Sequence, residues 1–84
     1  MKQAIMNAIN ERNEAALVAI LTDANKGLKI NLKHDTDEIL YEKRGKTWNY
    51  TRWDHGMLTY SAGNQRALSV AKCVMIDGWE VRVR

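Results

Sequence analysis

The spacing of apolar residues changes after Gly27, and this change sets the order of elements along the chain. Before it, apolar residues recur near the helical period of about 3.6 residues, as one buried stripe requires: Met6, Ile9, Leu17, Ile20, Leu21 and Ala24. After it, Leu28, Ile30 and Leu32 alternate with polar residues, as in a strand with one buried face. The sequence therefore predicts a helix followed by strands.

Residues 2–25 contain no glycine or proline and are predicted to form one long helix. Gly27 is well suited to end it, because glycine readily adopts the backbone conformation that closes a helix. The polar run 10–13 interrupts the apolar stripe, so a second interpretation stays open in which the helix breaks and Asn13 caps a second segment. We predict the continuous helix.

The strands are predicted from alternating patterns separated by clusters of turn-forming residues. They span residues 28–33, 38–44, 46–53 and 57–60. The turns that join them lie at 34–37, at Gly45 and at Asp54-His55-Gly56. Because each connection is short, neighbouring strands are expected to run antiparallel.

Residues 64–78 allow two interpretations. Helical spacing favours a second helix, with Asn64 as its N-cap and Gly78 as its end; the residues on its apolar side are Ala67, Val70, Ala71, Val74 and Met75. The pair Asp77-Gly78 would instead fit a hairpin turn. We predict the helix, followed by a closing strand in which Trp79, Val81 and Val83 face inward.

These elements predict an α+β fold for the 84-residue chain, which is short enough to be a single domain spanning residues 1–84. A long N-terminal helix packs on a three- to four-stranded antiparallel sheet, and a second helix and a closing strand follow. This architecture occurs in many unrelated proteins, so it carries no function by itself.

Five of the six aromatic residues lie within one stretch of twenty residues, interleaved with basic residues. The aromatic residues are Tyr41, Trp48, Tyr50, Trp53 and Tyr60, and the basic ones are Lys43, Arg44, Lys46 and Arg52. This mixture suits a nucleic-acid surface, where bases stack on rings and cations neutralise phosphates. It equally suits the packed face of a small sheet.

The register of the predicted hairpin separates these interpretations. A two-residue loop beside Gly45 places Tyr41 opposite Trp48 or Tyr50, on the side that Ile39 shares. We therefore predict that these residues form the core face covered by the N-terminal helix, because a slip by one residue would bury polar side chains. Trp53 falls on the polar face, which also carries Glu38, Leu40, Glu42, Arg44, Thr47, Asn49 and Thr51.

Trp53 is accordingly predicted as an interface anchor, since tryptophan and arginine are enriched at binding hot spots. The predicted partner-binding residues are Trp53, Arg52, Lys43, Arg44 and Lys46. Packing of Trp53 against an adjoining strand or the second helix is the structural alternative.

No pattern in the chain predicts catalysis, a metal site or a cofactor. The run from His34 to Glu38 lacks the spacing and the glycine of a calcium loop, and Asp54-His55 has no nucleophile at a suggestive spacing. Cys73, His34 and His55 are too few for a structural zinc site, which takes four ligands. We predict that the protein is not an enzyme.

The remaining features bear on partner and compartment. The net charge of +3 permits contact with phosphate or acidic surfaces without requiring either. Cys73 is the only cysteine, which favours a reducing compartment, and no segment has the apolar length of a signal peptide or a membrane span. A cytoplasmic protein without membrane contact is expected.

The resulting functional prediction is a non-catalytic binding protein, an inhibitor or adaptor that acts on a protein or nucleoprotein complex. Small chains of this type are frequent in phages and mobile elements, for example as anti-CRISPR proteins. The alternative is direct binding of DNA or RNA through the basic aromatic hairpin. A homodimer paired through the closing strand is a further possibility, because exposed sheet edges invite pairing.

Overall fold

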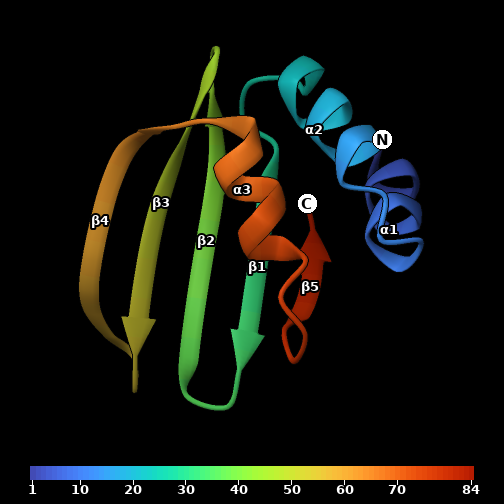
Figure 1. The fold of residues 1–84 in the computed structure, drawn as a ribbon. Coiled ribbons are helices and arrows are strands. Elements are labelled where there is room, and N and C mark those ends of the chain that lie inside the picture. Colours follow the sequence, from blue (N-terminus) through green and yellow to red (C-terminus); the bar gives the residue numbers. More distant parts are fainter.

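The computed structural model describes residues 1–84 and has an α+β architecture of three helices and five strands (Figure 1). The helices are α1 (Lys2–Asn10), α2 (Glu14–Asp23) and α3 (Ala67–Val74). The strands are β1 (Lys29–His34), β2 (Asp37–Arg44), β3 (Thr47–Asp54), β4 (Met57–Gln65) and β5 (Glu80–Val83). The predicted fold class is confirmed.

All five strands form one antiparallel sheet in the order β4-β3-β2-β1-β5. Three hairpins connect β1 to β4 in sequence, and α3 then carries the chain back across the sheet so that β5 pairs with β1 (Figure 1). The predicted closing strand therefore completes one edge of the sheet, and β4 forms the other.

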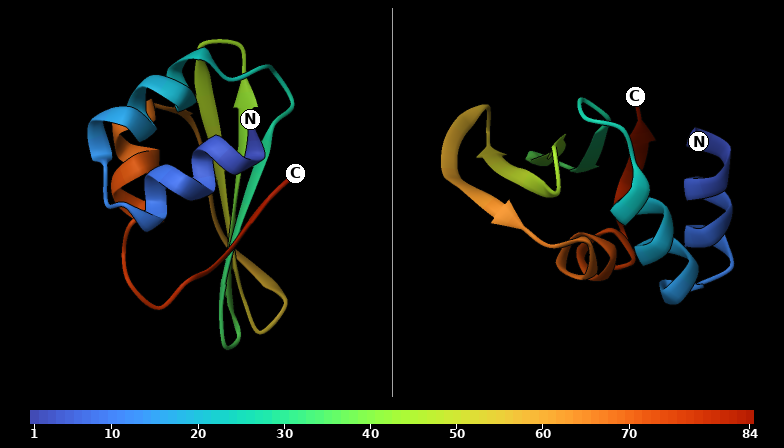
Figure 2. Two further views of the ribbon diagram at one scale, coloured as in Figure 1. Left: turned by 90° about the vertical axis from the view of Figure 1, so that its right-hand side faces the viewer. Right: turned by 90° about the horizontal axis from the view of Figure 1, so that it is seen from above.

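The three helices all lie on the same face of the sheet (Figure 2). Their apolar side chains and those of the inner strand positions form one core of buried residues: Ile5, Ala8, Leu17, Leu21, Ala24, Ile30, Leu32, Ile39, Tyr41, Trp48, Val70, Ala71 and Val74. The N-terminal helix was expected to cover the aromatic side of the hairpin. Instead, Tyr41 lies near Cys73 of α3, the helix that crosses in front of the central strands in Figure 1, and burial together with Cys73 raises the pKa of the Tyr41 hydroxyl.

The prediction of one continuous N-terminal helix is wrong, because the chain breaks between Asn10 and Glu14. The side chain of Asn13 accepts a hydrogen bond of 3.1 Å from the backbone N–H of Ala16 and so caps α2. The polar run 10–13 has no apolar side chain to bury, and Arg12 adopts a positive φ of 56° that redirects the chain. α1 can then pack against α2, as Figure 2 shows.

The helical interpretation of residues 64–78 is confirmed by α3, which buries Val70, Ala71 and Val74. Its start differs from the prediction, since the N-cap is Arg66. Asn64 instead belongs to β4, where it has a positive φ of 58°. β4 is therefore longer than the predicted strand at 57–60.

The predicted register of the aromatic hairpin is confirmed. Tyr41 lies opposite Tyr50 across β2 and β3, and the two-residue loop consists of Gly45 and Lys46. The rings of Tyr41 and Tyr50 are 5.3 Å apart between centroids. Tyr60 on β4 continues this row at 5.7 Å from Tyr50, so three tyrosines cross the sheet on its helix-covered side.

Candidate binding surface

The face of the sheet turned away from the helices carries no covering element (Figure 2). We call it the open face. Side chains alternate along a strand, so it receives the residues out of phase with the core: Lys29, Asn31 and Lys33 of β1, Glu38, Leu40, Glu42 and Arg44 of β2, Thr47, Asn49, Thr51 and Trp53 of β3, Leu58 and Ser61 of β4, and Glu80 and Arg82 of β5 with the following Arg84.

An apolar patch on the open face spans three strands. Trp53 lies opposite Leu58 of β4 and opposite Glu38 of β2, and Leu40 is its diagonal neighbour beside Thr51. Leu58 is 62% exposed, whereas Trp53 and Leu40 are partly buried. We call Leu40, Trp53 and Leu58 the Trp53 patch, and it combines a partly buried aromatic ring with accessible apolar surface.

A polar hollow of about 410 Å³ lies beside this patch, toward β5. It has no hydrophobic lining residue and is bounded by Asn31, Lys33, Asp35, Glu38, Glu80, Arg82 and Arg84. Asn31 is buried, and its Nδ2 donates to Glu38 Oε2 at 2.9 Å and to the carbonyl of Ile39 at 3.2 Å. These bonds fix the floor of the hollow.

The open face carries five cations, Lys29, Lys33, Arg44, Arg82 and Arg84, and three carboxylates, Glu38, Glu42 and Glu80. Arg44 pairs with Glu42 at 3.3 Å, and Arg82 pairs with Glu80 at 3.2 Å. Both pairs join residues two apart on one strand, which places them on the same face. Two of the five cations are therefore matched by neighbouring carboxylates, whereas Lys29, Lys33 and Arg84 form no ion pair.

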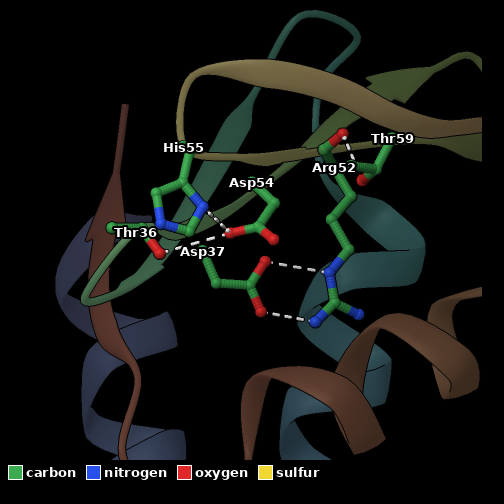
Figure 3. A network of polar contacts seen from close by, with 6 residues as sticks. All are labelled: Thr36, Asp37, Arg52, Asp54, His55 and Thr59. Carbon is green, nitrogen blue, oxygen red and sulfur yellow. Dashed lines mark hydrogen bonds and ion pairs between the residues drawn. The ribbon is translucent and has the colours of Figure 1, made fainter.

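Arg52, one of the predicted partner-binding residues, lies on the opposite face from Trp53. Its guanidinium donates two hydrogen bonds to Asp37, one of 2.9 Å from Nε to Oδ1 and a second from a terminal nitrogen to Oδ2 (Figure 3). The hydrogen bond from Arg52 holds the pKa of Asp37 below its ordinary value of 3.8, and the same contact raises the pKa of Arg52. Arg52 thus braces the sheet rather than joining the Trp53 patch.

Lys43, also predicted to contact a partner, is 1% exposed. Its Nζ donates to the carbonyl of Leu21 at 2.9 Å and to that of Thr22 at 2.8 Å. These carbonyls belong to the last turn of α2, where a cation offsets the unpaired acceptors of the helix end. Nζ also lies 5.5 Å from the ring centroid of Trp48. No partner can reach Lys43 in this fold.

Arg44 and Lys46 are exposed, but they lie at the far end of the sheet from Trp53. Arg44 pairs with Thr47 at the hairpin tip, and Trp53 follows six residues later. At about 3.3 Å per residue this separates them by roughly 20 Å. The structure therefore divides the predicted set between two ends and two faces of the sheet.

Leu40, Leu58 and Asn31 belong to the surface without having been predicted as binding residues. Alternation places Leu40 and Trp53 on one face. The contribution of Leu58 depends on how β4 pairs with β3, and that pairing shifts register between Arg52 and Trp53. No pattern within β4 alone reveals this shift.

The histidine and carboxylate groups at the β1–β2 and β3–β4 turns do not form a catalytic arrangement. Asp54 Oδ1 accepts a 3.2 Å hydrogen bond from Thr36 Oγ1 and lies 3.0 Å from His55 Nδ1 (Figure 3). The Thr36 hydroxyl is thus bonded to a carboxylate and not to an imidazole, and the Asp54 and His55 side chains are exposed. No group of three or more His, Cys, Asp or Glu side chains is placed to hold a metal ion.

Comparison with known proteins finds no relative of this chain. Neither a protein-family model, nor a curated protein, nor a solved structure matches this chain. None of its helices has the length and apolar character needed to cross a membrane.

Proposed function

We propose that this chain is a non-catalytic binding protein that docks a partner protein on its open face, with Trp53 as the anchor. The observation that carries the proposal is the Trp53 patch. In it, Trp53 lies beside Leu58 on a face that no helix covers, and Leu58 is 62% exposed. Aromatic anchors surrounded by polar groups are typical of binding hot spots. The polar hollow and the paired charges supply such a rim.

A protein partner suits this face better than nucleic acid does. Phosphate binding needs uncompensated cations, whereas Arg44 and Arg82 each have a carboxylate partner. Base stacking needs accessible rings, and Tyr41 and Trp48 are buried beneath the helices. The open face offers a single aromatic side chain. DNA or RNA binding remains the alternative, and Lys29 and Lys33 on this face are its support.

The role we propose for this binding is that of an inhibitor or adaptor of a protein or nucleoprotein complex in the cytoplasm. Support comes from the kind of chain: small, without a catalytic arrangement, and with one free cysteine. Phages and mobile elements use many chains of this kind against host defence complexes, and an anti-CRISPR-like role is the specific form of the proposal. The identity of the bound partner tests it.

Site-specific photo-crosslinking in the native host tests the docking face. A photoreactive side chain at Thr51, next to Trp53 on the open face, should crosslink one protein, and the product should disappear when Trp53→Ala is added. The same group at Ala19, exposed on α2, is the matched control and should give no such product.

Equal crosslinking from Thr51 and Ala19, or a product that Trp53→Ala leaves unchanged, would contradict the proposal. A nuclease-sensitive product from Thr51 would instead favour the nucleic-acid alternative. Circular dichroism of the Trp53→Ala variant must match that of the parent protein, because Trp53 is only partly buried and its removal should leave the fold intact.

A further inference from the structure

β4 is the edge strand of the sheet farthest from β5, and it pairs with β3 alone. Its outer side therefore presents a row of backbone N–H and C=O groups without strand partners. Such an edge is a template for pairing with another chain unless charge, proline or distortion protects it. Which of these protections β4 has decides what it can bind.

Protection by charge is absent, since the nine residues from Met57 to Gln65 include no charged side chain and no proline. Large apolar side chains are exposed on both faces of this strand: Tyr60 is 59% exposed toward the helix side, and Leu58 is exposed on the open face. Met57 is 73% exposed at its start. The strand thus offers both unpaired backbone and apolar surface.

Distortion limits the pairing to the middle of β4. The pairing with β3 shifts register between Arg52 and Trp53 and again between Trp48 and Tyr50. Between these irregularities, Tyr60, Ser61 and Ala62 pair regularly with Arg52, Thr51 and Tyr50. A second strand has regular backbone to bind over Tyr60–Ala62.

The opposite edge is protected. The segment 80–84 of β5 carries Glu80, Arg82 and Arg84 on the open face. In an antiparallel pair of identical strands, a residue near the two-fold axis faces its own copy, and like charges placed opposite each other are destabilising. Arg82 would meet such repulsion, whereas no residue of β4 would.

We propose that two copies of this chain pair through β4, antiparallel and centred on Ser61, so that their sheets join into one. Tyr60 of each copy then lies opposite Ala62 of the other, and apolar surface is covered on both faces. The arrangement also brings Arg66 of one copy to the Asp54-His55-Gly56 turn of the other, where Asp54 is exposed. Opposite charges therefore meet at both ends of the paired segment.

Light scattering coupled to size exclusion tests this pairing on the purified chain, without any partner protein. The parent protein should have twice the mass of one chain at high micromolar concentration. Ser61→Lys places a cation opposite its own copy at the axis and should reduce the mass to that of one chain. Glu80→Lys introduces the same charge at the β5 edge and should leave the dimer intact.

Ser61 is exposed, so its replacement should not alter the fold, and thermal unfolding followed by circular dichroism checks this. A parent protein that stays monomeric at every concentration would overturn the proposal. So would a dimer that survives Ser61→Lys, and loss of the dimer in Glu80→Lys alone would assign the contact to β5.

A cysteine at the axis gives a second, geometric readout. In a Cys73→Ala background, Ser61→Cys should form a disulfide between two chains on mild oxidation, because residues opposite each other on paired strands lie within reach of such a bond. Arg82→Cys is the matched control on β5 and should give no disulfide-linked product, because the proposed dimer keeps the two β5 strands apart. A linked product from Arg82→Cys and none from Ser61→Cys would contradict pairing through β4.

Discussion

At the scale of single residues, the position of Lys43 shows most clearly how this fold uses a charged side chain. Lys43 alternates in phase with Ile39 and Tyr41, so the strand directs it into the core. Its aliphatic stem is buried with them, and its ammonium reaches the last turn of α2. The alternation of side chains along β2 alone therefore predicts that Lys43 points inward. The prediction that Lys43 binds a partner together with Arg44 and Lys46 did not take this alternation into account.

We predict that Lys43→Met destabilises the protein, by about 1–3 kcal/mol, because the carbonyls of Leu21 and Thr22 lose their donor in a buried site. Methionine keeps most of the apolar stem, so the loss reflects the hydrogen bonds rather than a cavity. Urea unfolding measures the change, with Lys46→Met in the exposed loop as control. Equal stability of the two variants would show that Lys43 contributes nothing beyond its stem.

At the scale of elements, the break between α1 and α2 shows that composition predicts the presence of helix, whereas packing determines where the helix ends. The absence of glycine and proline in residues 2–25 favours helix throughout, and both helices do form there. Composition does not reveal whether a polar turn can overhang the core. The chain bends after Asn10 because each short helix then finds its own apolar neighbours, Ile5 and Ala8 in one and Leu17 and Leu21 in the other.

Asn13→Ala should destabilise the protein by about 1 kcal/mol, since the N–H of Ala16 loses the side-chain acceptor that caps α2. Asn10→Ala is the matched control: Asn10 is the last residue of α1 and caps no helix. Thermal unfolding should show a lower midpoint for Asn13→Ala only. Equal midpoints for both variants would argue that the break depends on tertiary packing and not on the cap.

The strands were predictable in more detail than the helices. Their two-residue period and the glycine at the hairpin loop determine the pairing of Tyr41 with Tyr50, and this places Trp53 on the outer face. β4 was predicted too short because Ser61, Gly63 and Asn64 favour turns and loops. Pairing with β3 overrides that preference, and the register shifts allow the strand to continue to Gln65.

At the scale of the whole molecule, the helices share one face, and the other face carries the ion pairs Arg44–Glu42 and Arg82–Glu80. The sequence thus predicts which face of the sheet carries the candidate site, because alternation places Trp53 outward. It does not predict which residues act together there, because the distance between Trp53 and the hairpin tip follows only from the length of the strands. Consecutive residues such as Arg52 and Trp53 cannot act on one surface, because they point to opposite sides of the sheet.

Because Arg44 and Arg82 are paired with carboxylates and Trp53 is the only aromatic side chain of the open face, we predict that the protein does not bind nucleic acid measurably, even at low salt. Fluorescence anisotropy with a labelled single-stranded oligonucleotide of mixed sequence, titrated at two salt concentrations, measures this. Binding at low salt that weakens steeply as salt is added would indicate released counterions. That result would favour the nucleic-acid alternative over a protein partner.

The contribution of β4 to the Trp53 patch, through Leu58, has a consequence for how a partner would be held. Strands joined edge to edge in one continuous sheet keep their open faces on the same side, so the paired molecule would present two copies of Trp53 to one partner. A partner with repeated or symmetric subunits could then engage both at once, and the second contact would form at the high effective concentration that a rigid connection provides. Modest affinity at each patch would become avidity, and a monomeric variant would lose it with every side chain of the patch intact.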